Sequence, residues 1–328
     1  MKDLIINLLK SNENSFISGQ KISEELGITR AAIWKYMNQI KEEGYEIVSV
    51  SRKGYMLINS PDLLTSNEIK NNLNTEFIGK NIIHFDSINS TNIKAKELAE
   101  LGEIEGSIVI SEEQTMGRGR LGRSWLSPKH TGIWISIILR PDMLPNKAAM
   151  ITQVGAAAVA TALKKLGITS YIKWPNDILV NGKKVCGILT EMSCELNQIN
   201  YIIMGIGINV NQNPSDFPEE LSNIATSIKI EEGKSFSRKL LLSQILNEFE
   251  VLYYEFVKNN NVKPSIHICK YNSILLGKEI KIINRGQLIS VTALDIDDNG
   301  ELIVEYPDGK IDKLISGEVS MHGLWNKS

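Results

Sequence analysis

The chain has few of the residues from which covalent cross-links and metal cages are built. Its 328 residues include three cysteines and four histidines, and the cysteines form no C-x-x-C pair. An odd, unclustered set of cysteines is typical of a reducing compartment and argues against a disulfide framework. The histidines lie far apart in the sequence, so a histidine metal cage is not expected.

Long apolar runs and a strong net charge are absent as well. No segment approaches the roughly 18 apolar residues of a membrane span, and the N-terminus does not resemble a signal peptide. The formal net charge is -2, so the chain as a whole has no excess of positive charge that would indicate a nucleic-acid partner. Hydrophobic residues make up 42% of the chain, which is ordinary for a globular protein and sufficient for real cores. We therefore expect a cytoplasmic protein of two or three domains without a membrane partner.

The first 60 residues have the pattern of a winged helix-turn-helix. Apolar residues at helical spacing predict three helices, and Ser18 and Thr29 stand where they can cap the second and third. A predicted strand at 46–50, a polar tip and a second strand at 55–58 form the wing. An α+β fold that begins with a DNA-binding unit follows from this pattern.

The basic residues of this unit lie where DNA would be met. The helix-turn-helix runs from Gly19 to Asn38, with Arg30 and Lys35 on its recognition helix, and the wing carries Arg52 and Lys53. A helical interaction domain is the alternative, because residues 1–60 hold eight Lys/Arg against seven Asp/Glu. Because this small number of basic groups can make only a weak electrostatic contribution to phosphate binding, DNA binding would need a dimer.

Composition and periodicity divide the rest of the chain into two further parts. Helix and strand patterns alternate from about 65 to 270, which predicts an α+β layer with a mixed or antiparallel sheet. After Tyr271 the period becomes two, and short strands between Asp/Asn-Gly turns predict a small SH3-like β-barrel. The expected domains are residues 1–62, 63–270 and 271–328.

The segment MGRGRLGRSWLSP, residues 116–128, has the glycine spacing of a nucleotide-binding loop. A strand precedes it, but no helical pattern follows and no Walker lysine is present, so the dinucleotide and P-loop interpretations fail. An RNA-binding arginine-glycine tract would be longer and repetitive. An ordered anion-binding loop remains, in which Arg118, Arg120 and Arg123 supply charge and the glycines permit close backbone approach. A solvated charged loop is the alternative.

A second constellation reads YIKWPND at 171–177, followed by the hairpin ILVNGKKVCGIL. Period two predicts Lys184, Cys186 and Ile188 on one face of the second strand, with Lys183 and Val185 on the other. A lysine that leads into an apolar strand is a candidate for a functional buried charge. A solvated lysine at the hairpin tip is the alternative, and it suits Lys183 better.

The motifs GRGRLGRSW, KWPND and K-x-x-G-I-L, in this order, resemble those of the biotin–protein ligases. Together with the winged helix, the whole chain is similar to the bacterial members that combine a ligase with a repressor of the biotin operon. The resemblance implies a class II synthetase-like catalytic domain with a mixed sheet between the winged helix and the SH3-like domain.

The activity implied by the resemblance is ATP-dependent. The family joins biotin to ATP, with Mg²⁺, to give biotinyl-5'-AMP and pyrophosphate, and passes the biotinyl group to a lysine of a biotin carboxyl carrier protein domain. Positive groups are needed because the reacting carboxylate and phosphate repel one another. As a homodimer formed on ligand binding, such a protein also binds operator DNA and represses biotin synthesis genes.

The resemblance also assigns roles to individual residues. Lys184, Arg118 and Arg120 match the catalytic positions. Biotin would contact Ser90, Thr91, Asn92, Gln114, Arg118, Gly119, Arg120, Trp134, Lys184 and Gly187. The adenylate would contact Arg120, Arg123, Trp125, Asn176, Lys184 and Asn209, and Asp177 would hold Mg²⁺.

Structural alternatives stand beside several of these roles. Ser90 and Thr91 could cap a helix, Trp125 and Trp134 could be core residues, and Asp177 could be a turn residue. For the chain as a whole, a lipoate-type ligase is an alternative, although lipoate has little use for a set of polar ureido-binding groups. A ligand-sensing repressor with an inactive ligase domain is another, and the retained arginines and Lys184 argue against it.

Overall fold

The computed structural model describes residues 1–12, 14–284, 287–317 and 319–321. The chain divides into two compact units, Met1–Asn71 and Asn72–Ser328. Within the described residues no helix has the length and apolarity needed to cross a membrane.

The first unit is a winged helix-turn-helix, as predicted. Its elements are α1 (Lys2–Ser11), α2 (Gly19–Leu26), α3 (Arg30–Glu42), β1 (Glu46–Val50), β2 (Gly54–Asn59) and α4 (Ser66–Lys70). The side chains of Ser18 and Thr29 cap α2 and α3 by accepting the N–H of Lys21 and Ala32. Apolar residues of the three long helices and the hairpin form one core, which includes Ile5, Ile22, Ile33, Met37 and Leu57.

A seven-stranded mixed sheet organises the second unit. Its strands lie in the order β3 (Ile82–Phe85), β4 (Ile108–Ser111), β5 (Gly132–Leu139), β9 (Gln198–Asn209), β8 (Lys183–Glu195), β7 (Asp177–Val180) and β6 (Tyr171–Lys173). Only the β3–β4 pair is parallel. The predicted Asn181-Gly182 turn joins β7 and β8, with both residues at positive φ.

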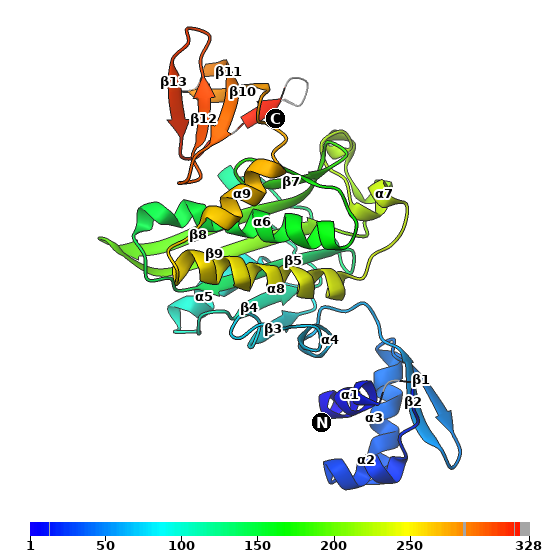
Figure 1. The fold of residues 1–328 in the computed structure, drawn as a ribbon. Helices are drawn as coiled ribbons and strands as arrows, with labels where there is room; N and C mark the ends of the chain where they lie inside the picture. The colour runs from blue at the N-terminus through cyan, green and yellow to red at the C-terminus, as the bar shows by residue number, and fades with distance from the viewer. Residues whose placement is uncertain (13, 285–286, 318, 322–328) are drawn as a thin grey trace. The chain divides into compact units, whose positions relative to one another are not determined.

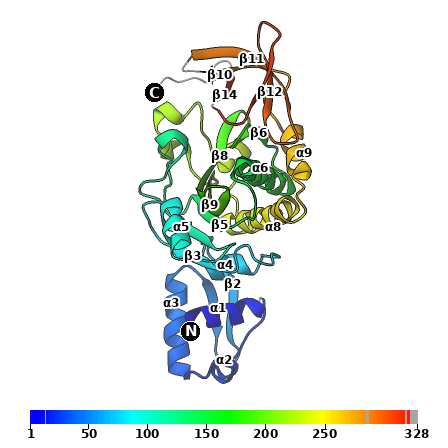
Figure 2. The same cartoon turned by 90° about the vertical axis from the view of Figure 1, so that its left-hand side faces the viewer.

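Helices cover the two faces of this sheet unequally (Figures 1 and 2). Helices α6 (Ala148–Lys165) and α8 (Arg238–Val257) pack on one face, and α9 (Lys263–Tyr271) packs against α6. On the other face α5 (Thr91–Glu100) packs against β4, β5 and β9. A short helix, α7 (Ile228–Glu232), follows β9. The face that carries α5 is the face on which the predicted site residues gather.

The last part of the chain is a five-stranded antiparallel sheet. Its order is β13 (Ile311–Leu314), β12 (Leu302–Glu305), β11 (Gln287–Ile296), β10 (Glu279–Asn284) and β14 (Val319–Met321). The Gly300 carbonyl anchors it by accepting from Gln153 Nε2 at 2.5 Å and Trp174 Nε1 at 2.9 Å. The antiparallel β fold predicted for this part is confirmed over the described residues. The bounds 271–328 stay a prediction, and residues 285, 286, 318 and 322–328 of that range lie outside the described part.

Candidate active site

The glycine-arginine segment forms an ordered loop closed by its own backbone. Gln114 N–H donates to the Ser127 carbonyl at 3.1 Å, and Trp125 N–H donates to that of Gly117 at 2.8 Å. A single 3₁₀ turn, Arg120–Gly122, lies at the tip, and no α-helix follows it. The prediction of an irregular loop rather than a nucleotide-binding strand–loop–helix is therefore confirmed.

Glycines on the central strands give this loop a flat floor. Gly187 on β8 lies opposite Gly207 on β9, and Gly207 lies opposite Trp134 on β5. A Cβ at Gly207 would lie 2.6 Å from Nε1 of Trp125, and a Cβ at Gly187 would lie 2.9 Å from its ring. Only residues without side chains allow the indole to approach the sheet so closely.

Trp125 is therefore neither a solvated residue nor an ordinary core residue. Its ring is half-buried on the glycine floor, and the ammonium of Lys184 lies 5.2 Å from the ring centroid. Its Nε1 is buried, and no residue in the described part of the chain accepts a hydrogen bond from it. An indole donor of this kind is suited to a bound ligand with an acceptor.

Lys184 reaches this site because β8 carries a bulge. The β7–β8 register shifts so that Ile178 pairs with Cys186 while Leu179 pairs with Lys184. The prediction that Lys184 shares a face with Cys186 and Ile188 is therefore wrong. Lys184 Nζ instead lies 3.2 Å from the position of a Cβ at Gly187, on the site face.

Two neighbouring residues of the KWPND motif hold the cationic side chains. Lys184 Nζ lies 2.6 Å from Oδ1 of Asp177, and Arg120 donates to Oδ1 of Asn176 at 3.0 Å. The Asn176 amide in turn donates to the Ile188 carbonyl at 2.9 Å. Arg120 and Lys184 thus contact adjacent residues of one turn.

Polar groups form a continuous chain beside the floor. Gln114 Oε1 accepts from the backbone N–H of Thr91 at 2.8 Å and from its hydroxyl at 3.0 Å. Ser136 on β5 lies 2.8 Å from Thr91 Oγ1 and 2.6 Å from Asn92 Oδ1. Ser90 occupies the N-cap position of α5, as the capping alternative has it, although its side chain makes no cap hydrogen bond. Thr91 is the first residue of the helix, and its hydroxyl donates to Gln114.

Other predicted site residues lie around this centre. Trp134 is fully buried on the same face of β5 as Ser136, and its indole N–H donates to the Pro128 carbonyl at 3.4 Å. Asn209 is buried and donates to the Thr226 carbonyl at 3.0 Å. Gly119 N–H donates to the Arg123 carbonyl at 2.7 Å. Arg118 and Arg123 are exposed on the loop.

Within the described residues this site has neither a reactive thiol nor a metal site built from protein ligands alone. Burial raises the pKa of the Cys186 thiol well above its ordinary value, so this side chain is a neutral thiol at physiological pH. No cluster of three or more His, Cys, Asp or Glu side chains in metal-binding proximity occurs in the described ranges. A divalent cation here would depend on phosphate oxygens for most of its ligands.

Three site residues were missed by the sequence analysis. Gly205 and Gly207 stand two apart in GIGINV, so both face the site, and Ser136 faces it from β5. The signal for the glycines was their period-two spacing within an apolar strand, which places both on one face.

The first unit carries a polar groove of about 300 Å³. The start of α2, the start of α3 and the wing line it, through residues that include Ser18, Gly19, Arg30, Ser51 and Arg52. Lys35 and Lys53 are exposed on the same recognition helix and wing. The four predicted DNA-contacting cations are thus on the surface of the two elements expected to meet a duplex.

Family models match all three parts of the chain. The "Biotin/lipoate A/B protein ligase family" matches residues 84–209, an "HTH domain" matches residues 2–56, and the "Biotin protein ligase C terminal domain" matches residues 275–322. These matches define a class of protein ligase that carries a helix-turn-helix domain.

Similar proteins narrow the class. The bifunctional ligase/repressor BirA of Bacillus subtilis is 41% identical over 98% of both chains, and that of Escherichia coli is 30% identical over 97% of this chain and 96% of that one. The biotin protein ligase from Aquifex aeolicus, solved in complex with biotin and ATP, is 31% identical with a TM-score of 0.63 over 74% of this chain and 98% of that one. The chain belongs to the biotin–protein ligase family, with the bifunctional ligase/repressors as its full-length relatives.

Gly205 provides a test of the close packing on the floor. A Cβ at this position would collide with Oδ1 of Asn92. Gly205→Ala is expected to lower the free energy of unfolding by about 1–3 kcal/mol, the usual cost of overpacking. Gly317→Ala is the matched control, because its Cβ would meet nothing within 4 Å. Urea denaturation measures both, and equal stability of the two variants would contradict the packing described.

Proposed function

We propose that this chain joins biotin to ATP to form biotinyl-5'-AMP and then transfers the biotinyl group to a lysine of a biotin carboxyl carrier protein domain. The observation that carries the proposal is the meeting of Lys184, Arg120 and Trp125 over the glycine floor, beside the Thr91–Gln114 polar chain.

The first reaction unites two anions. A carboxylate oxygen of biotin attacks the α-phosphorus of ATP, the bond to the bridging oxygen breaks, and pyrophosphate leaves. Lys184 offers a compact charge near the carboxylate and α-phosphate, and Arg120 offers a planar donor fork for phosphate. Arg118 and Arg123 would add charge from the loop. Because the site is partly shielded from water, each charge acts more strongly than in solution.

The ligands are expected to divide the floor between them. The ureido ring of biotin needs donors and acceptors, which Ser90, Thr91, Asn92 and Gln114 supply. Trp134 and Gly187 would border its apolar part. The adenylate would lie near Trp125, Asn176 and Asn209, with the buried Nε1 of Trp125 available to it. This polar pocket favours biotin over lipoate, whose dithiolane ring lacks such groups.

Mg²⁺ fits this site through a single carboxylate. Asp177, the carboxylate beside Lys184, would hold the cation with Asn176 next to it in the chain, and phosphate oxygens would complete the coordination. When bound with ATP, the cation would neutralise part of the phosphate charge. Asp177 also pairs with Lys184, so loss of the Asp177 carboxylate would disturb both the cation and the Lys184 ammonium.

Transfer requires no enzyme nucleophile. The lysine amine of the carrier attacks the carbonyl carbon of the acyl-adenylate, AMP leaves, and the amine loses a proton to give an amide. The neutral Cys186 thiol lies on the face of β8 away from the site and is no candidate for an acyl carrier.

The first unit is proposed to act as a repressor of biotin synthesis genes. The polar groove of this unit, lined by the starts of α2 and α3 and by the wing, can bind a backbone phosphate. The exposed face of α3 would then enter the major groove. A homodimer formed on binding of biotinyl-5'-AMP would pair two such units on a two-fold site. The dimer compensates for the small number of cations in one unit.

Lys184 tests the ligase. Lys184→Ala is expected to slow formation of biotinyl-5'-AMP by about 10²–10³-fold, as for the loss of one preorganised charge stabiliser. Lys183→Ala is the matched control, since Lys183 donates to the Ser222 carbonyl and is not part of the floor. Pyrophosphate release with biotin and Mg-ATP measures both. Similar rates for the two variants would show that the site is wrongly assigned.

Arg52 tests the repressor. Duplexes selected from a random pool by the unsubstituted protein, with biotin and Mg-ATP present, serve as the probe. Arg52→Ala should weaken binding and reduce the slope of log K against log salt by about one per subunit, because one phosphate contact is lost. Lys2→Ala, which removes an ion pair with Glu43 away from the wing, should leave the slope unchanged. Equal slopes in all three proteins would contradict wing contact with DNA.

A further inference from the structure

A buried ion pair lies at the base of the glycine-arginine loop. Glu112 directly follows β4 and Arg238 begins α8, and both side chains are only 1% exposed. Arg238 Nη1 donates to Glu112 Oε2 at 2.7 Å and to the Gly132 carbonyl at 3.1 Å. One guanidinium therefore joins the end of β4 to the start of β5, which are the two strands between which the loop is inserted.

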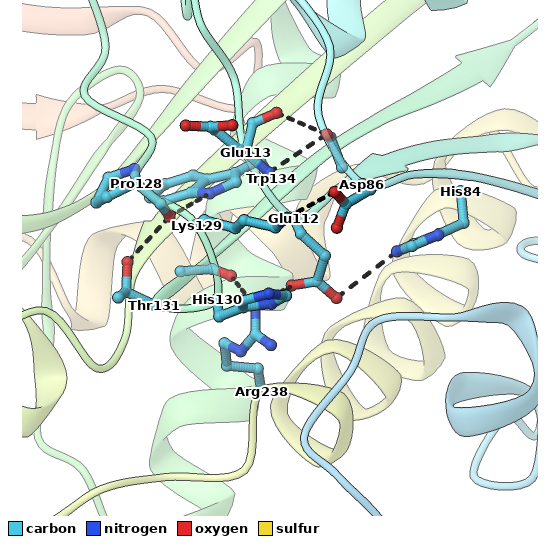
Figure 3. A network of polar contacts seen from close by, with 12 residues as sticks. His84, Asp86, Glu112, Glu113, Pro128, Lys129, His130, Thr131, Trp134 and Arg238 are labelled. Carbon is cyan, nitrogen blue, oxygen red and sulfur yellow. Dashed lines mark hydrogen bonds and ion pairs between the residues drawn. The ribbon is translucent and has the colours of Figure 1, made fainter. Parts of the chain in front are cut away.

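Two histidines lie against the same carboxylate (Figure 3). Nδ1 of His130 is 3.2 Å from Glu112 Oε2, and Nε2 of His84 is 3.6 Å from Oε1. The backbone N–H of His130 also donates to the Glu112 carbonyl at 3.3 Å. His130 has a φ of +61°, a left-handed conformation that a side-chain-bearing residue adopts only when its surroundings hold it.

These contacts lie next to the first rung of the loop. Glu112 precedes Gln114 by two residues, and His130 follows Ser127 by three, while Gln114 and Ser127 pair through the backbone. The direction in which the loop leaves the sheet therefore depends on how the Glu112–Arg238 pair holds its two ends. The positions of Gln114 and Arg120, which are both proposed to contact ligand, depend on that direction.

Stability alone is a poor reason for this arrangement. Replacing a buried ion pair by apolar side chains of similar volume is often neutral or stabilising, whereas removing one partner is strongly destabilising. The pair fixes the relative positions of three elements that are distant in the sequence, because all three converge on one carboxylate.

We propose that Glu112 and Arg238 are positioning residues that hold both ends of the glycine-arginine loop, so that biotin and ATP meet it in its binding arrangement. The inference rests on the proposed ligase function. Neither residue touches the reacting atoms, so their loss acts through Gln114 and the loop arginines.

Glu112→Gln is the first test. A loosened loop must be ordered by ligand, so KM for biotin should rise about tenfold while kcat at saturation stays within about threefold. Amide exchange of residues 115–127 in the unliganded protein should become faster, with α6 unchanged. Lys129→Ala is the control, because it removes an exposed pair with Asp86 beside the same loop. An unchanged KM and unchanged loop exchange in Glu112→Gln would overturn the proposal.

Two further variants separate positioning from folding. His130→Asn keeps a residue that tolerates positive φ. It removes the contact that the exposed His130 ring makes with the buried Glu112 carboxylate, so KM for biotin should rise by about twofold to fivefold. Glu112→Leu with Arg238→Met removes both charges and should restore the melting temperature without restoring KM. Recovery of KM and loop exchange along with the melting temperature would show a purely stabilising role. If the unsubstituted protein lacks biotin-dependent activity, the ligase proposal fails. Amide exchange of the loop residues still tests whether the Glu112–Arg238 pair holds the two ends of the loop.

Discussion

Repulsion between a carboxylate and a phosphate is the constraint on which the proposed site depends. At contact distance two like charges in a medium of low polarity oppose approach by several kcal/mol. Positive groups must therefore be in place before the anions meet, without a water layer that would screen them. Lys184 and Arg120 stand at adjacent positions of the Asn176–Asp177 turn, which is an arrangement suited to that task.

The sheet supplies this arrangement through two departures from a regular strand. Glycines at 187, 205 and 207 remove side chains where the indole and the amide of Asn92 approach the backbone. The bulge on β8 then turns Lys184 toward the same face, which simple alternation would not do. Helices α6 and α8 cover the opposite face of the sheet, which leaves the α5 side for ligands. Because of its glycines, the floor on that side is formed by backbone more than by side chains.

Most of the fold could be predicted from periodicity and turn residues, because these are local signals. Ser18, Thr29 and the Asn181-Gly182 turn each act within a few residues of their own position. The motif residues of the site followed from the family resemblance. The face of Lys184 could not be predicted, since a bulge depends on pairing with another strand. The Glu112–Arg238 pair was equally hidden, because 126 residues separate its partners and neither lies in a motif.

The most direct measurement of the central claim is biotin-dependent exchange of labelled pyrophosphate into ATP, made without any carrier protein. This exchange reports the union of the two anions and its reversal, and no later step. The account predicts exchange that requires biotin and Mg²⁺ and that lipoate does not support. Exchange driven by lipoate and not by biotin, or no exchange from a folded protein with either acid, would contradict it.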